Sequence, residues 1–370
     1  MNKNVLTALT ALAASTGLAA ATLATGTPTA SAAASVAPVA CTVNLSSYAT
    51  PGATDSRAGV HNAMRAVANR GGGTICVDGM YNIRNYIDLD IIPRSADIKF
   101  VGTSTSSSGF TATANSPIFF QGDQTLRPEA NGNVNSPYRG QYRYNSAFSN
   151  MKLVKPAGTV GRIFDFRTGA QVNMTISNIQ IDTAATGANN EAIYFGPHVQ
   201  SHGSLYQNLR VEVRKVNTSG AFRVNTAHNF WNNNAIQSST FYKFDNNGAP
   251  LIELRPTTGQ YTNNRIVSVT GQNGAGGFIH VYGQSGGGIY DSSNWDNKAG
   301  SVYRDSIRVG KTSTSYATNG YVISGVGKVE EGTGQTAMMS GRHRIAIGAG
   351  SSNITVQGAS ATPVWTGLTY

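Results

Sequence analysis

Charged residues are scarce in this chain. Only 12% of its 370 residues are Asp, Glu, Lys or Arg, about half of the roughly 25% that soluble domains carry. A helical bundle needs more Glu, Lys and Arg on its exposed faces, so the composition argues against one. Disorder is excluded as well, because 40% hydrophobic residues with 9% aromatics can bury a large core. The composition favours an ordered, β-rich protein with a surface of Ser, Thr, Asn and Gly.

Cysteine and the common catalytic motifs are nearly absent too. The chain has two Cys residues and no Cys-x-x-Cys pair, and His198, His202 and His228 lack the fixed spacing of a zinc site. No nucleophile elbow and no phosphate loop is present, and the Gly runs indicate turns. No nucleic-acid-binding module is recognisable. We therefore expect no metal, no cofactor and no nucleic acid partner.

The N-terminal segment 1–32 has the features of a signal peptide. Lys3 precedes an apolar stretch that ends at Ala30-Ser31-Ala32, a small-x-small pattern that predicts cleavage after Ala32. No later segment is long and apolar enough to span a membrane. We expect a secreted, extracellular bacterial protein whose net charge falls from +10 to +9 with the loss of Lys3. In that oxidising compartment Cys41 and Cys76 are expected to form a disulfide.

A single helix precedes the β-rich part. Thr54 or Asp55 can begin it, its apolar residues Val60, Ala63, Met64 and Val67 recur at helical spacing, and Gly71 ends it. A strand at 74–77 follows. We assign 33–100 to an N-terminal cap that contains this helix and the disulfide.

Farther along, strand-like triplets recur at a fixed period. Each is an apolar-x-apolar centre, and they follow one another in steps of 27 to 30 residues, the range that indicates a solenoid. The triplets are 164–166, 193–195, 222–224, 252–254 and 279–281. A second series places Asn before an apolar strand start, at Asn178, Asn208, Asn234 and Asn264. We expect these Asn residues to stack as a structural ladder at an inward turn.

These two series predict an all-β fold, a right-handed single-stranded parallel β-helix with an N-terminal capping helix. Regular coils are assigned to 151–300, and closing coils with a C-terminal cap to 301–370. The period lapses over 101–150, which we interpret as a long insertion loop. The solenoid can be a monomer or a homotrimer.

The sequence resembles the pectate-lyase-like superfamily, which has the pectin lyase fold. The resemblance rests on the helix followed by Gly71-Gly72-Gly73-Thr74-Ile75-Cys76-Val77 and Met80-Tyr81-Asn82-Ile83, and on the Asn series. No specific family is identified. The resemblance implies a carbohydrate-active enzyme and a substrate groove along the strands that contain the triplets.

The middle residue of each triplet points outward, because its apolar neighbours point inward. These residues form a column that we call the strip: Asp165, Tyr194, Arg223, Glu253 and His280. The next outward row is Arg167, Gly196, Asn225, Arg255 and Tyr282. Surface positions in this composition are mostly Ser, Thr and Asn, so charged and aromatic residues gathered in one column favour a binding or catalytic site. Cross-strand charge pairs are, however, also ordinary stabilisers of sheets.

The strip suits a lyase better than a two-carboxylate hydrolase. Asp165 and Glu253 are three coils, about 14 Å, apart, whereas glycosidase carboxylates are about 5 to 9.5 Å apart. In β-elimination Arg223 would neutralise a uronate carboxylate, Tyr194 and His280 would exchange protons, and Glu253 would orient Arg223 or His280. Calcium needs several converging oxygens, and the two acids of the strip are not adjacent. Asp182 and Glu212 are flanked by Arg210 and Arg214, which predicts a salt-bridge ladder there.

The positive net charge predicts an anionic polysaccharide substrate. Its expected contacts are Asp165, Arg167, Asn225, Arg255, Tyr282, His198, His228, Arg139 and Arg143, with Lys152 and Lys155 nearby. Three alternatives remain open. They are a C5-epimerase; a β-helix glycoside hydrolase or glycosyl (for example fructosyl) transferase that uses Glu253 with a loop carboxylate such as Asp245; and a non-catalytic glycan-binding solenoid.

Overall fold

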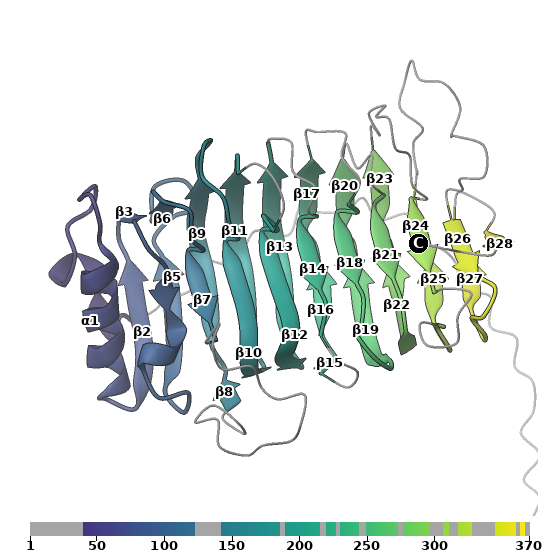
Figure 1. Ribbon diagram of the computed structural model, residues 1–370, viewed down its shortest axis with the longest axis horizontal. Coiled ribbons are helices and arrows are strands. Elements are labelled where there is room, and N and C mark those ends of the chain that lie inside the picture. The colour runs from purple at the N-terminus through teal and green to yellow at the C-terminus, as the bar shows by residue number, and fades with distance from the viewer. Residues whose placement is uncertain are drawn as a thin grey trace, which may run out of the picture. The chain divides into compact units, whose positions relative to one another are not determined.

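Short strands that pair in parallel with strands one coil away build this chain into a β-solenoid (Figure 1). The computed structural model describes residues 40–122, 142–185, 189–214, 220–226, 230–243, 249–272, 277–295, 306–310, 317–327, 345–359 and 363–366. The segment 1–32 and its cleavage position lie outside them. The predicted all-β parallel β-helix is confirmed, and its right-handed sense stays the prediction of the crossover rule.

One stack of strands contains the triplets, and it pairs strand on strand through the described chain. It consists of β4 (Ile87–Asp88), β7 (Phe119–Gln121), the first residues of β10 (Phe164–Val172) and β12 (Ile193–His202), β14 (Phe222–Val224), β18 (Ile252–Leu254), β21 (Ile279–Val281), β24 (Ile307–Val309), β26 (Ile345–Gly348) and β28 (Val364–Thr366).

A second stack continues from the same long strands after a register shift between Phe166 and Thr168. It consists of β8 (Tyr142–Tyr144), the ends of β10 and β12, β15 (Trp231–Asn232), and the starts of β19 (Tyr261–Val267) and β22 (Gln284–Tyr290).

A third stack closes the coils. Its strands are β1 (Val43–Asn44), β2 (Gly72–Val77), β3 (Met80–Ile83), β5 (Asp97–Gly102), β6 (Gly109–Ala112), β9 (Ala147–Lys155), β11 (Thr175–Thr183), β13 (Leu205–Val213), β16 (Ala235–Gln237), β17 (Thr240–Lys243), the ends of β19 and β22, β20 (Thr270–Gln272), β23 (Ser293–Trp295), β25 (Val322–Ser324) and β27 (Thr355–Gln357).

Helix α1 (Arg57–Ala68) lies beside β2 at the N-terminal end of these strands (Figure 1). Val60, Ala63, Met64 and Val67, the predicted apolar face, are fully buried. Two three-residue 3-10 helices, η1 (Leu45–Ser47) and η2 (Leu89–Ile91), are the other helical segments that the structure describes. None of these helices has the length and apolar character of a membrane span.

Aromatic side chains fill the interior between the stacks. Phe119 stacks on Phe164 at 5.1 Å between ring centroids, and Phe166 stacks on Phe195 at 4.9 Å. All four rings are fully buried. Such pairs add to the free energy of burial, so the inward positions of the triplets hold neighbouring coils in register.

The predicted disulfide is present, and it joins β2 to the segment before β1. Cys41 and Cys76 are bonded with their Cα atoms 5.5 Å apart, an ordinary separation for a disulfide. A disulfide fits the expected export of the protein.

The segment 101–150 is only partly a loop. It contains β6, β7, β8 and the start of β9, which pair with neighbouring strands. The interpretation of the whole segment as an insertion loop is therefore wrong, because strands of three or four residues are too short to give a clear alternation. Residues 123–141 lie outside the described part.

The four Asn residues do not form one ladder. Asn178 and Asn208 are exposed and lie at equivalent positions, between paired residues of β11 and β13, whereas Asn234 and Asn264 are buried and aligned with Ser204. In the buried column Asn234 accepts from the Ser204 N–H at 2.9 Å, and Asn264 accepts from the Asn234 N–H at 3.1 Å. The step of 26 residues from Asn208 to Asn234, instead of 30, reflects this change of column.

Candidate functional site

The strip is one column of the first stack. Asp165, Tyr194, Arg223, Glu253 and His280 are direct partners on successive parallel strands. Phe120 extends the column before Asp165, and Arg308 extends it after His280. The inward triplet positions fix this alignment, so the backbone register brings together the five residues that the sequence pattern grouped.

Exposure divides the strip into a reachable centre and covered ends. Tyr194, Arg223 and Glu253 are partly exposed. Asp165 is 2% exposed and His280 is 1% exposed. Tyr282 in the next row is also 1% exposed, and its hydroxyl lies 3.5 Å from Nδ1 of His280. The expectation that Asp165, His280 and Tyr282 contact a substrate is therefore wrong for the structure described here, because their side chains are covered.

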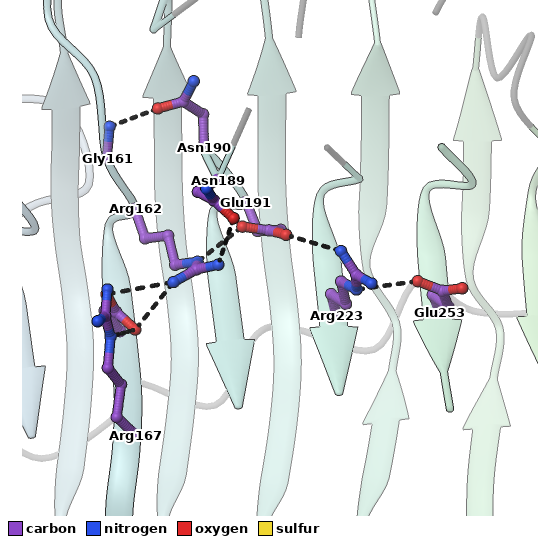
Figure 2. A network of polar contacts seen from close by, with 9 residues as sticks. Gly161, Arg162, Arg167, Asn189, Asn190, Glu191, Arg223 and Glu253 are labelled. Carbon is purple, nitrogen blue, oxygen red and sulfur yellow. Dashed lines mark hydrogen bonds and ion pairs between the residues drawn. The ribbon is translucent and has the colours of Figure 1, made fainter. Parts of the chain in front are cut away.

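The centre of the strip belongs to a network of charges (Figure 2). Arg162 binds Glu191 through Nε at 2.7 Å and Asp165 through Nη1 at 3.3 Å. Arg167 reaches the same Asp165 carboxylate from the other side at 2.8 Å. Glu191 and Asp165 are almost completely buried, so the guanidinium groups supply the compensation that buried carboxylates need.

Arg162 is held as a cation beneath Tyr194. Burial alone lowers the pKa of Arg162, but the charges of Glu191 and Asp165 outweigh burial and raise this pKa above its ordinary value. Its guanidinium lies 3.5 Å from the centroid of the Tyr194 ring, within cation–π distance. Asn189 accepts a further bond from Nη2 at 3.2 Å. These contacts fix both the cation and the phenol ring.

Arg223 is held by two carboxylates, one from the segment that precedes β12 and one from β18. Its Nη1 donates to Glu191 at 3.4 Å, and its Nε forms an ion pair with Glu253 at 3.0 Å, although this N–H is not aligned for a hydrogen bond. No described residue bonds to Nη2, and the side chain is 32% exposed. Arg223 therefore keeps one terminal nitrogen, Nη2, without a partner among the described residues.

The next row contributes fewer groups than expected. Asn225 and Arg255 are half-buried, His198 is exposed, and Gly196 is buried backbone. The Arg167 side chain is 37% exposed, although it binds Asp165. Arg139, His228 and Asp245 lie outside the described residues.

Two of the basic residues expected near the substrate are internal. Arg143 is 2% exposed and donates to the Leu89 carbonyl at 2.7 Å, and burial lowers its pKa to about 10. Lys155 is fully buried, and its ammonium donates to the Ser116 carbonyl at 2.5 Å. The expectation that Arg143 and Lys155 bind a glycan is wrong, because β8 and β9 direct both side chains inward.

The expected salt-bridge ladder is present on the third stack. Asp182 and Glu212 are partners one coil apart, and Arg214 binds both, at 2.7 and 2.5 Å. Arg210 also binds Glu212 at 2.7 Å. Across the described part of the chain, no group of three or more His, Cys, Asp or Glu side chains is arranged to hold a metal ion.

The sequence analysis missed Arg162 and Glu191, which connect the network. Each precedes its triplet by two residues, and the two lie one coil apart. This position lies outside both repeating series, the strand centres and the Asn residues. An Arg and a Glu at equivalent positions 29 residues apart are the signal in the sequence that points to the pair.

Neither the known family models nor the curated proteins match this sequence. Solved structures give three informative similarities. The mannuronan C-5 epimerase AlgE4 A-module of Azotobacter vinelandii is 11% identical, with 88% of this chain and 98% of that chain covered at a TM-score of 0.37. PfbA, a surface adhesin of Streptococcus pneumoniae, is 15% identical, with 86% and 79% covered at 0.48.

The third is the tailspike gp49 of Acinetobacter baumannii bacteriophage Fri1, a capsular polysaccharide depolymerase. It is 10% identical, with 86% of this chain covered at a TM-score of 0.43, and this chain spans 55% of the tailspike's length. At these levels of similarity, function has to be argued from the side chains of this chain.

Proposed function

We propose that this chain is an extracellular enzyme that cleaves an acidic, uronate-containing glycan by β-elimination at Tyr194 and Arg223. The supporting observation is the pairing of these residues on adjacent strands, with Arg223 anchored by Glu191 and Glu253 and its Nη2 without a described partner. This nitrogen can donate a charge-assisted hydrogen bond to a substrate carboxylate.

In the proposed elimination step, Arg223 neutralises a negative charge and Tyr194 moves one proton. Arg223 neutralises the carboxylate at C5, which makes the C5 proton more acidic. Tyr194, as the phenolate, takes this proton. The C–H electron pair forms the C4–C5 double bond, the C4–O bond breaks, and Tyr194 returns the proton to the leaving oxygen. Arg162, 3.5 Å from the ring, stabilises negative charge on the phenol.

The proposed mechanism gives His280 no proton-transfer role, because its side chain is buried and cannot reach the substrate. Glu253 orients Arg223 through their ion pair. Arg167, Asn225 and Arg255 lie in the next row on the same face and are the proposed contacts for neighbouring sugars.

The test is the ultraviolet absorbance of unsaturated product during incubation with a panel of uronate polymers. Tyr194→Phe should lower the rate by about 10²- to 10⁴-fold, the usual contribution of a proton-transfer group. Tyr242→Phe, on the third stack, is the matched control and should keep the rate. Absence of unsaturated product over the whole panel would overturn the lyase proposal.

A hydrolase or glycosyl transferase is the second candidate, because Arg223 contacts two carboxylates, Glu191 and Glu253. Reducing ends without unsaturated product would favour hydrolysis, and Glu253→Gln should then abolish activity. Two further outcomes are distinguishable. A change of product stereochemistry without cleavage indicates an epimerase, and saturable binding without turnover indicates a binding solenoid.

A further inference from the structure

A continuous series of ring and guanidinium contacts leads from the strip to α1. Arg167, whose guanidinium binds Asp165, lies 5.7 Å from the centroid of the Phe120 ring. The Phe120 ring lies 4.8 Å from the Tyr86 ring. Arg57, the first residue of α1, lies 5.5 Å from the Tyr86 ring. The face that carries Arg223 therefore continues over the earlier coils without a gap in contacts.

Tyr86 is the outer ring of an aromatic pair. Phe120 is 4% exposed and packs against the Tyr86 ring at an interplanar angle of 49°, whereas Tyr86 itself is partly exposed. Tyr86 directly precedes β4, which pairs with β7 through Asp88 and Phe120. Although Phe120 and Arg57 both contact the ring, the exposed part of Tyr86 offers an apolar surface and a hydroxyl for hydrogen bonding.

One side-chain nitrogen of Arg57 forms a hydrogen bond, and its two terminal nitrogens can donate to a ligand. Its Nε donates to the Tyr86 carbonyl at 2.9 Å, which holds the guanidinium near the ring. No described residue forms a hydrogen bond or ion pair with its two terminal nitrogens, and the residue is partly exposed.

Two carboxylates lie near this positive charge. Asp55 accepts from the Arg57 backbone N–H at 3.0 Å, and Asp88 accepts from the Asp90 N–H at 2.9 Å. Burial raises the pKa of Asp88, which means that its negative charge is less favoured than usual. A ring beside an anchored guanidinium whose two terminal nitrogens have no described partner suits a sugar that bears a carboxylate.

We propose that Arg57 and Tyr86 form a second subsite, which binds a carboxylate-bearing sugar ring of the same glycan chain. The sugar packs against the exposed part of Tyr86, and its carboxylate binds the terminal nitrogens of Arg57. The strand of Asp88 is four coils from the strand of Arg223, which is about 19 Å at the usual strand spacing. Only a chain of several sugars can fill both places. This inference rests on the proposed acidic-glycan substrate.

The test measures equilibrium binding of oligogalacturonates and alginate oligosaccharides, from two to ten units long, to protein carrying Tyr194→Phe so that chains stay intact. Adding Arg57→Gln or Tyr86→Ala should weaken binding of the long oligosaccharides about tenfold and leave binding of the short ones unchanged. Tyr86→Phe keeps the ring and should retain most of the affinity. Arg65→Gln, an equal charge change at an exposed position of α1, is the matched control.

Equal weakening for all lengths, or no weakening, would overturn the subsite and leave the central site in place. If the parent protein binds none of these oligosaccharides, the acidic-glycan proposal fails together with the subsite. Thermal unfolding of Arg57→Gln and Arg65→Gln separates a loss of fold from a loss of contact, and Arg57→Gln keeps the test decisive if Tyr86→Ala does not fold.

Discussion

Glu191 is the residue on which the charge network depends most. It is fully buried and contacts two guanidinium groups, those of Arg162 and Arg223. Removing its charge leaves Arg162, which is itself buried, without its nearest counter-charge. Breaking a buried pair in this way typically costs about 3 to 5 kcal/mol.

Glu191→Gln should therefore lower the free energy of unfolding by about 3 kcal/mol, measured by denaturant titration. Glu212→Gln is the matched control, because Glu212 also contacts two Arg residues, yet their side chains are 62% and 49% exposed. Exposed pairs contribute at most about 1 kcal/mol. Because Glu212 is itself 4% exposed, the two variants differ mainly in the exposure of the Arg partners, and an equal loss would show that the burial of Arg162 does not determine the contribution of Glu191.

His61 couples stability to pH. Its ring accepts the Asp88 N–H at 3.0 Å, and burial, followed by repulsion from Arg57 and Arg65, lowers its pKa from 6.5 to about 4. Because the folded-state pKa lies below the unfolded one, its stabilising effect is complete above about pH 6.5. It is lost as the pH falls from there toward about 4.

The expected loss across this interval is on the order of 3 kcal/mol. His61→Gln should be less stable than the parent at pH 7 and should show a flatter dependence of unfolding free energy on pH between 6.5 and 4. Unchanged slopes in that interval would contradict the assignment to His61.

At the scale of elements, residues with a left-handed backbone conformation (positive φ) lie at the corners of the coils. Asn150, Asn178 and Asn208 have φ values of 55°, 52° and 51°, and Ser238 continues the same column with 48°. Asn tolerates this region better than other residues with a side chain. The exposed Asn column therefore serves backbone geometry, which differs from the inward ladder expected from the sequence.

Asn208→Ala should lower the free energy of unfolding by about 1 kcal/mol, because Ala disfavours a positive φ. Asn208→Gly should cost less, since Gly adopts this conformation readily. Chemical denaturation of the two variants provides the comparison. An Ala variant as stable as the Gly variant would show that φ does not explain the choice of Asn.

The triplets were predictable because their inward residues must fill the core. Each apolar-x-apolar centre coincides with a strand of the first stack, and the strip follows from it. The Asn residues were less predictable, because Asn favours both buried ladders and left-handed corners. Two such columns share the 30-residue period, and the sequence alone does not say which column a given Asn occupies.

The alternation of apolar and polar residues did not predict which side chains of the site are exposed. Alternation gives the direction of His280 and Tyr282 relative to their own strand, yet both are covered. Arg162 and Glu191 lie before their strands, where no alternation applies, so their contribution became visible only with the fold. Backbone register was thus more predictable than side-chain surroundings.

At the scale of the whole molecule, part of the excess of basic residues lies in the interior and not on the surface. The formal charge is +10, but Arg143 and Lys155 are internal, and Arg162 is buried in the network. Because these side chains are buried, they cannot contact a bound polyanion directly. Binding of an acidic glycan should therefore depend on direct contacts at Arg223 more than on the total charge.

This difference can be measured through ionic strength. Raising the salt concentration from about 0.1 M to about 1 M shortens the Debye length from about 10 Å to about 3 Å, which removes long-range attraction but weakens a close guanidinium–carboxylate contact less. We expect the dissociation constant for polygalacturonate to rise only several-fold over this range, with saturable binding retained at high salt. Arg223→Gln should weaken binding at both salt concentrations, whereas Arg210→Gln, an equal charge change on the third stack, should act only at low salt. If binding disappears at 1 M and the two variants behave alike, the affinity comes from the overall positive charge, and the assignment of the substrate carboxylate to Arg223 is wrong.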